Sequence, residues 1–152
     1  MKKIAMLGCG RWGSFIAKYL SDIGHDVTLY GREASPHMQA FLQTGKNGLM
    51  TLPPHVRLCT ELKSAITGAD IVAISVGSQA LRGLLCELRA AGLAKGTVVL
   101  CMKGLEIGTG KRLSQIAEEE LGKGVAVAVW LGPGHVQEFC NGIPNCMVID
   151  SE

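Results

Sequence analysis

Short apolar runs alternate with amphipathic segments along the whole of this sequence. The apolar runs are typical of strands buried in a sheet, and they cover residues 3–7, 27–30, 56–60, 71–76, 97–102, 125–131 and 146–149. Between most of them, apolar residues recur at helical spacing, over residues 11–23, 35–43, 61–67, 81–88, 113–121 and 136–140. This alternation predicts a doubly wound, mostly parallel sheet with right-handed crossovers and helices on both faces, which is a three-layer α/β/α architecture.

The chain is expected to form one domain over residues 1–152. Of its 152 residues 47% are hydrophobic, which is enough to bury a core without disulfides or metals, and no internal repeat or linker interrupts them. Residues 44–55, which include two glycines and two prolines, are predicted to form a loop. The last apolar run is followed only by Asp150, Ser151 and Glu152, which favours a cut between two domains over a natural end.

The distribution of charge argues against several functions. The net charge is +2 and no run of Lys and Arg occurs, so we expect no nucleic-acid partner. No apolar run approaches the ~18 residues of a membrane span. The apolar stretch after the first three residues covers only residues 4–7, against roughly 7–15 residues in a signal peptide. These features predict a cytoplasmic protein without membrane insertion.

The six cysteines are predicted to be buried, reduced thiols. They form no C-x-x-C pair, and the four histidines do not stand at zinc-ligand spacing from them, so we expect no metal. Cys59, Cys101 and Cys146 fall in apolar runs, and free cysteine is among the most buried residue types. Reduced thiols also favour a reducing cytoplasm.

The first strand and the first helix meet at a Gly-Cys-Gly-Arg-Trp-Gly hexapeptide, which matches G-x-G-x-x-G in the strand-then-helix context that this pattern requires. Gly8 allows the tight turn, Gly10 lets the backbone approach a pyrophosphate, and Gly13 lets the helix pack close to the strand. The backbone N–H groups of Arg11 and Trp12 are expected to face the pyrophosphate at the helix N-terminus. We expect the Trp12 indole to turn toward packing. The pattern predicts a Rossmann-type dinucleotide-binding domain, with a purely structural glycine turn as the alternative.

The end of the second strand bears on the choice of cofactor. An NAD enzyme usually has Asp or Glu here to bind the ribose hydroxyls, whereas this chain has Gly31 and Arg32. Gly31 leaves room, and the Arg32 guanidinium can pair with a 2′-phosphate. NADPH is therefore favoured over NADH. A solvated Arg32 is the alternative, and Glu33 keeps NADH possible because it can reach the ribose.

Further candidates follow the carboxyl ends of the later strands. Gly77 and Ser78 form a turn that can contact the nicotinamide-side ribose, while Gln79 is interpreted as a helix-start residue. Lys103 ends an apolar strand, which is costly unless it meets an anion or reaches solvent. It is the candidate cation beside a reacting carbonyl and a substrate phosphate. His135 follows Gly-Pro-Gly at a helix start, where a structural histidine is expected more often than a proton donor.

The chain resembles the N-terminal domain of the bacterial NAD(P)-dependent glycerol-3-phosphate dehydrogenases. The matching segments keep their order and rough spacing over nearly the whole chain, at residues 8–13, 29–32, 75–79, 103–106, 131–133, 138 and 142–144. The glycine turn is shared by many dehydrogenases, whereas Lys-Gly-Leu-Glu and Gly-Pro…Glu…Gly-x-Pro together are much more specific. The resemblance implies reduction of dihydroxyacetone phosphate to sn-glycerol 3-phosphate, the backbone for phospholipid synthesis.

The resemblance also implies roles for individual residues. Four positions match family contacts to the dinucleotide, namely Arg11, Trp12, Arg32 and Val136. Lys103 matches the lysine that touches both cofactor and substrate, where it would stabilise negative charge developing on the carbonyl oxygen. Gly132 and Gly134 match positions that contact the substrate.

This chain departs from the family pattern in several places. Gly77 replaces the usual Pro, Gly134 the usual Ser or Thr, and Val136 the usual Ala. The missing hydroxyl at position 134 weakens the assignment of the substrate. The Gly-x-x-Lys-Asn motif of the family's C-terminal helical substrate domain has no match among the 152 residues. We therefore expect that domain to be absent from this chain, and the chain alone to bind dinucleotide without turnover.

Two other functions stay open on this evidence. One is a related dehydrogenase of another small hydroxy or keto acid, similar to ketopantoate reductase or 6-phosphogluconate dehydrogenase. The other is a dinucleotide-sensing module without catalysis, which a natural stop codon after residue 152 would support. If a second domain is missing, the surface that met it should be partly apolar, and the isolated chain could form a homo-oligomer.

Overall fold

The computed structural model describes residues 1–143 and 145–151, so that Pro144 of the predicted 142–144 motif and Glu152 lie outside the described residues. The strands are β1 (Lys3–Leu7), β2 (Asp26–Tyr30), β3 (Arg57–Cys59), β4 (Ile71–Ile74), β5 (Gly96–Leu100), β6 (Val125–Leu131) and β7 (Val148–Ser151). The helices are α1 (Arg11–Asp22), α2 (Pro36–Thr44), α3 (Leu62–Ile66), the 3₁₀ turn η1 (Ser78–Ala80), α4 (Leu81–Ala90), α5 (Leu113–Leu121) and α6 (Val136–Cys140). The predicted order of strands and helices is confirmed.

The sheet is doubly wound, as predicted. Its strands lie in the order β3-β2-β1-β4-β5-β6-β7, and all neighbours are parallel except β6 and β7. The chain winds outward from β1 to β3 and then crosses over to β4, so the winding direction reverses between β1 and β4. Ligands of open α/β sheets bind beyond the carboxyl ends of the strands at such a switch point.

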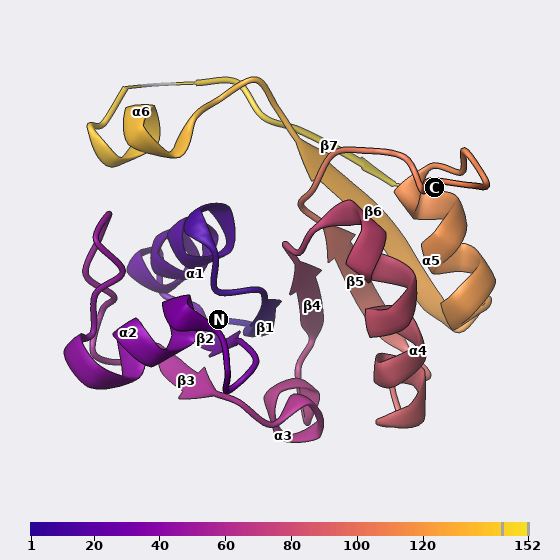
Figure 1. Cartoon of the computed structure of the whole chain (residues 1–152), viewed down its shortest axis with the longest axis horizontal. Helices are drawn as coiled ribbons and strands as arrows, with labels where there is room; N and C mark the ends of the chain where they lie inside the picture. The colour runs from indigo at the N-terminus through magenta and orange to yellow at the C-terminus, as the bar shows by residue number, and fades with distance from the viewer. Residues whose placement is uncertain (144, 152) are drawn as a thin grey trace.

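Strand β1 shows how alternating residues divide between the two faces of the sheet. Ile4 and Met6 join a core cluster with residues of α1 and α2, whereas Ala5 and Leu7 join a second cluster with residues of α3, α4 and α5. Figure 1 shows α1 and α2 on one side of the sheet and α4 and α5 on the other. The predicted three layers are therefore present, and each face buries its own core.

Strand β7 departs from the predicted pattern. The apolar run at 146–149 is expected to be buried, but the strand begins at Val148 and all of its residues are exposed. Strand β7 lies at the edge of the sheet, and Val148 and Ile149 remain 59% and 68% exposed. The side chains of a strand point to the two faces of the sheet, and β7 packs mainly against β6 in the plane of the sheet, so its apolar side chains stay exposed.

The prediction of buried thiols holds for two cysteines and is wrong for three. Cys9 and Cys101 are buried, and burial raises the pKa of the Cys101 thiol to about 12. Cys86, Cys140 and Cys146 are exposed. The physical reason is position, because Cys86 lies off the buried Leu stripe of α4 and the other two flank the exposed end of the chain. The sixth, Cys59, is half-buried at the other edge of the sheet.

Candidate dinucleotide-binding site

The glycine turn has the geometry that the sequence predicts. Gly8 has a φ of +113°, and a Cβ atom there would lie 2.1 Å from the carbonyl oxygen of Ser75. A Cβ atom at Gly13 would lie 1.9 Å from the carbonyl oxygen of Gly8, so α1 packs directly on the turn. A Cβ atom at Gly10 would meet no atom within 4 Å. Two glycines are therefore required by packing, and the third borders open space that a ligand can approach.

The N-terminus of α1 opens into the same space. Gly10 is its N-cap residue, no side chain caps it within the described part of the chain, and its first turn holds no acidic residue. The Ser14 hydroxyl donates instead to the carbonyl oxygen of Gly10, 2.8 Å away. The N–H groups of the first turn of a helix lack acceptors within the helix. This end of α1 is thus suited to an anion that approaches through the open space beside Gly10.

A cleft of about 450 Å³ lies beyond the carboxyl ends of β4, β5 and β6. It brings together six of the predicted site residues, namely Arg11, Trp12, Lys103, Gly132, Gly134 and Val136. Its cationic residues are Arg11 and Lys103, and none of the described lining residues is acidic. The cleft therefore favours an anionic ligand.

Trp12 packs as predicted and also borders the cleft. Its ring stacks on Phe15 at a centroid distance of 5.6 Å and lies against Phe139 of α6 at 5.7 Å. Phe15 and Phe139 stack in turn at 5.4 Å. These three rings hold α6 against α1, as the neighbouring positions of the two helices in Figure 1 show.

The structure explains why positions 132 and 134 are occupied by glycine, which the sequence did not reveal. A Cβ atom at Gly132 would lie 2.4 Å from the sulfur of Met147, and one at Gly134 would lie 2.3 Å from the ring of Phe139. The ring therefore occupies the space in which the Ser or Thr side chain of the family pattern would begin. Phe139 follows Gly134 by five residues and Met147 follows Gly132 by fifteen, but neither position shows in the sequence that its side chain packs on a glycine.

The expectation that Gly31 leaves room for a ligand is wrong. Gly31 is buried, and a Cβ atom there would lie 2.4 Å from the sulfur of Cys9 and 2.9 Å from the methyl carbon of Met38. The space is filled from inside the core. Arg32 itself is exposed at the carboxyl end of β2, and none of the ion pairs among the described residues includes it.

The second predicted cofactor turn lies beyond β4. Gly77 precedes η1, and a Cβ atom there would meet nothing within 4 Å. Ser78 is the first residue of η1, and its Cβ and Oγ atoms would each lie 3.0 Å from a Cβ atom at Gly104. Gln79 does lie at a helix start, as interpreted from the sequence. Its side chain also accepts from the N–H of Ile107 and donates to a second backbone group of the loop after Lys103.

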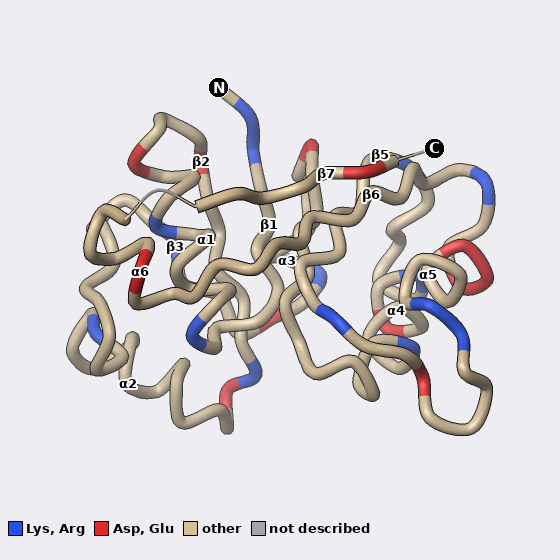
Figure 2. The backbone as a smooth tube through the Cα atoms, turned by 90° about the horizontal axis from the view of Figure 1, so that it is seen from above, with Lys and Arg blue, Asp and Glu red and all other residues tan. Residues whose placement is uncertain are grey.

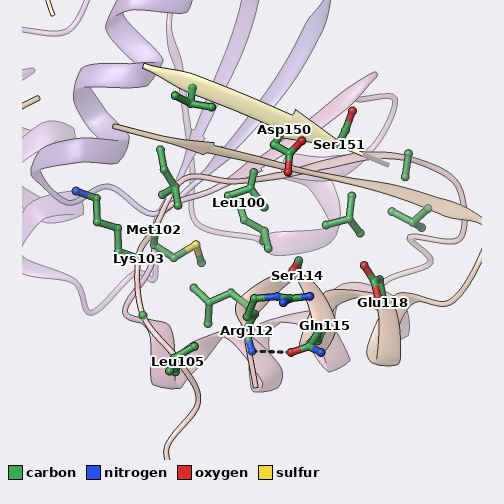
Figure 3. Close-up of a pocket in the computed structure, with 18 of the residues that line it drawn as sticks. Leu100, Met102, Lys103, Leu105, Arg112, Ser114, Gln115, Glu118, Asp150 and Ser151 are labelled. Atoms are coloured by element: carbon green, nitrogen blue, oxygen red, sulfur yellow. Dashed lines mark hydrogen bonds between the residues drawn. The ribbon is translucent and has the colours of Figure 1, made fainter. Parts of the chain in front are cut away.

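Lys103 is exposed and lies between two hollows. It lines the cleft described above and also a larger hollow of about 1260 Å³ on the α5 side of β5, β6 and β7. Figure 3 shows its side chain pointing away from Ser114, Glu118 and Asp150, which line the larger hollow. No ion pair among the described residues involves Lys103. Its side chain is open to solvent beside the cleft, where a ligand can reach it.

Sequence reasoning missed several further lining residues, among them Ser75, Trp130 and Met147. Ser75 follows β4, Trp130 lies near the end of β6, and Met147 precedes β7. The position of Ser75 at a strand end beside the switch point was the available signal. His135 also lines the cleft and starts α6, where its backbone N–H donates to the Glu138 carboxylate, 3.1 Å away. Among the described residues no group of three metal-ligating side chains occurs, and no helix is long and apolar enough to cross a membrane.

A doubly wound sheet with an open glycine turn and a cation-lined cleft at its switch point defines a dinucleotide-binding Rossmann domain. Residues 3–152 match the family model of the NAD-dependent glycerol-3-phosphate dehydrogenase N-terminus, and the chain belongs to this family. The resemblance drawn from the sequence is thereby confirmed.

Curated and structural relatives agree with this assignment. The chain is 40% identical to a glycerol-3-phosphate dehydrogenase [NAD(P)+] of Moorella thermoacetica. The aligned region covers 97% of this chain and 44% of the relative. It is 37% identical to the protein of the same name from an Exiguobacterium species, over 98% of this chain and 45% of the relative. The crystal structure of glycerol-3-phosphate dehydrogenase from Coxiella burnetii superposes with a TM-score of 0.89 at 28% identity, over 99% of this chain and 46% of that one. The chain thus spans a little under half the length of these relatives.

Proposed function

We propose that residues 1–152 form the NAD(P)-binding half of a glycerol-3-phosphate dehydrogenase, and that a C-terminal helical substrate domain completes the enzyme. The reaction is the reduction of dihydroxyacetone phosphate to sn-glycerol 3-phosphate for phospholipid synthesis. The observation that carries the proposal is the meeting of Lys103 with Arg11 and Trp12 of the glycine turn in one cleft. The names and lengths of the curated relatives support it.

In this proposal the dinucleotide lies across the carboxyl ends of β1 and β4. Its pyrophosphate approaches Gly10 in the turn between Gly8 and Gly13, and accepts from the N–H groups of Arg11 and Trp12. The open backbone at Gly10 supports this placement, because a side chain there would meet no protein atom. The nicotinamide-side ribose contacts the Gly77–Ser78 turn and Val136, which borders the cleft.

Lys103 is the catalytic residue that we assign to this half of the enzyme. The cofactor, when bound, supplies the hydride that reaches the carbonyl carbon of the substrate. The Lys103 ammonium group stabilises the negative charge that develops on the carbonyl oxygen, and contacts both cofactor and substrate. Gly132 and Gly134 contribute backbone contacts to the substrate, since the Phe139 ring already occupies the space beside Gly134.

NADPH is the preferred cofactor in this proposal, and NADH remains a usable one. Arg32 is exposed at the end of β2, in the position where a dehydrogenase selects between the two. Its guanidinium can form a bidentate pair with a 2′-phosphate, which only NADPH has. Glu33 is also exposed and can reach the ribose hydroxyls of NADH. We assign no metal to the reaction.

We further propose a cytoplasmic protein whose isolated dinucleotide domain self-associates. Exposed thiols persist in a reducing compartment, which supports the location. Leu105, Ile107, Val148 and Ile149 are each more than half exposed, which supports association through apolar surface. A concentration-dependent increase in sedimentation coefficient is the expected result. A single monomeric species at high concentration would contradict the homo-oligomer.

The test compares the 152-residue chain with the product of a longer reading frame that contains it. The chain alone should bind NADPH in a calorimetric titration and should not turn over dihydroxyacetone phosphate. The longer protein should oxidise NADPH when this substrate is added, and Lys103→Met should lower that rate by two orders of magnitude or more, as loss of charge stabilisation at an oxyanion typically does. A chain that binds neither nucleotide, or an enzyme that prefers another keto acid, would overturn the proposal.

A further inference from the structure

A small hairpin follows Lys103 and is attached to the rest of the domain through two side chains, Gln79 and Arg82. Leu105 pairs with Arg112 in an isolated antiparallel bridge, and the Glu106 N–H donates to the carbonyl oxygen of Lys111, 3.0 Å away. We call residues 105–112 the lysine hairpin. Only residues 101–104 separate it from the end of β5, so the position of the hairpin limits where the Lys103 backbone can lie.

The first attachment of the lysine hairpin is a two-point ion pair. The Nε and Nη2 atoms of Arg82 on α4 lie 2.7 and 2.8 Å from the two carboxylate oxygens of Glu106. Such bidentate pairs fix geometry as well as distance. The Glu106 side chain is only 15% exposed and that of Arg82 33%, so solvent screens the pair less than a typical surface ion pair.

Arg82 also neutralises two further carboxylates. Its guanidinium contacts Glu120 at 2.6 Å and Glu119 at 3.2 Å, both on α5. Three carboxylates therefore converge on one cation, and the other cations at this cluster, Lys111 and Arg89, each reach only one of them. Figure 2 shows the acidic and basic stretches of α4, α5 and the intervening loop side by side. Loss of the Arg82 charge would leave these carboxylates repelling one another and would release Glu106.

The second attachment comes from the segment that carries the predicted cofactor turn. The Gln79 side-chain amide donates to the carbonyl oxygen of Leu105 and accepts from the N–H of Ile107, each at 2.9 Å. Gly104 has a φ of +130°, and a Cβ atom there would lie 3.0 Å from Ser78. The hairpin is thus tied to residues 78–82, directly after the Gly77–Ser78 turn.

We infer that Arg82 and Gln79 are positioning residues, which hold the lysine hairpin through Glu106 and thereby fix Lys103 relative to the Gly77–Ser78 cofactor turn. The inference rests on the proposed function, because it concerns the geometry of Lys103 in that reaction. Lys103 is exposed and has a long, flexible side chain. Its backbone must therefore be held by its surroundings if the ammonium group is to meet a carbonyl oxygen repeatedly in the same place.

The experiment measures kcat and KM in the longer dehydrogenase that contains this chain, for Arg82→Gln, Arg82→Lys and Lys103→Met. Arg82→Gln should lower kcat by about tenfold or more, because misplacement of a catalytic group by a fraction of an ångström has effects of this size. The KM for NADPH should change less than about twofold, because the substitution leaves unchanged the interactions that bind the cofactor equally well in the ground state and in the transition state. Arg82→Lys should recover part of the loss, because it keeps the charge without the bidentate geometry.

Two controls separate positioning from a general loss of stability. Arg57→Gln makes the same replacement in an exposed ion pair with Asp26 at the other edge of the sheet, and should leave kcat unchanged. In the Lys103→Met background, Arg82→Gln should add little further loss, because coupled residues are not additive. If Arg82→Gln does not fold, Glu106→Gln removes the paired charge from the hairpin and gives the same test.

The outcomes distinguish this inference from the proposed function. Wild-type kcat in both Arg82→Gln and Glu106→Gln, with an inactive Lys103→Met, would overturn the positioning role and leave the function intact. Wild-type kcat in Lys103→Met would overturn the role of Lys103 itself, and the inference with it. If Arg82→Gln lowers kcat by the same factor in the wild type and in the Lys103→Met background, Arg82 acts independently of the lysine.

Discussion

The glycine turn and the lysine hairpin face the same end of the sheet but are held in place by different physical means. The turn is fixed by backbone against backbone, since a single methyl group on Gly13 would lie 1.9 Å from the Gly8 carbonyl oxygen. The hairpin is fixed by side-chain charge, through Glu106, Arg82 and the carboxylates around them. The turn should therefore respond to volume and the hairpin to charge. This difference predicts which perturbation each region tolerates.

The largest expected effect is a steric one in the glycine turn. Gly13→Ala places a Cβ atom in contact with backbone, which cannot move aside as a flexible side chain can, so α1 must shift from β1. Overpacking of this kind typically costs ~1–3 kcal/mol, occasionally more. Denaturant unfolding of the chain should show a lower midpoint and calorimetry should show lost NADPH binding.

Gly10→Ala is the matched control for this substitution. It adds the same methyl group three positions earlier, at a site where a Cβ atom would meet no atom within 4 Å, so the unfolding midpoint should stay close to that of the wild type. NADPH affinity should fall nevertheless, because the methyl group points into the space that we assign to the pyrophosphate. Equal stability of the Gly13 and Gly10 variants would contradict the steric account of the turn.

The local character of the turn explains why it could be predicted from the sequence. Gly8 and Gly13 have the tight turn and the close packing that the motif assigns to them, and Gly10 borders open space, because strand, turn and helix are consecutive in the chain. The doubly wound, mostly parallel sheet followed from the alternation of strands and helices for the same reason. The exposure of β7 did not, since an apolar run does not reveal that its strand lies at an edge.

The attachments of the lysine hairpin could not be predicted, because its partners are distant in the sequence. Arg82 and Glu106 are 24 residues apart, and the spacing between Arg82 and Glu120 is 38. Glu118, Glu119 and Glu120 are consecutive acidic residues of α5, and two of their carboxylates contact Arg82. Long-range pairs of this kind leave no periodic signal, so only the folded structure identifies them.

The next effect concerns the charge of Arg32, which is exposed at the carboxyl end of β2 and stands apart from both regions. Arg32→Ala should weaken NADPH binding by about tenfold or more and leave NADH binding unchanged, because a hydrogen bond to a charged group contributes ~1.5–3 kcal/mol. Calorimetric titrations at two salt concentrations measure this, and only the NADPH affinity of the wild type should fall strongly with salt. Equal losses for both nucleotides would remove Arg32 as the selector, and would favour a contact to the adenine ring or the shared ribose.

The smallest expected effect is the response of the two regions to acid. The Arg82 guanidinium and the Thr109 hydroxyl hold the pKa of the Glu106 carboxyl at about 2, below its usual 4.5. Hydrogen bonds from Lys111 and Arg82 also lower the pKa values of Glu119 and Glu120 respectively. A depressed carboxyl pKa stabilises the folded form fully above the unfolded value, and that contribution is lost as the pH falls from about 4.5 toward 2. The lysine hairpin should therefore loosen over this window.

Carboxyl NMR titration and amide hydrogen exchange test this response residue by residue. In the wild-type chain Glu106 should titrate near 2, and amide protection in the lysine hairpin should fall before that of α1 as the pH is lowered. Arg82→Gln should return the Glu106 pKa toward its usual value and shift the loss of protection to higher pH. The glycine turn holds no carboxylate, so its amides should keep their protection until the whole domain unfolds. If both regions lose protection at the same pH, the lysine hairpin and the glycine turn unfold as one unit. That result would contradict the view that charge holds one region and backbone packing the other.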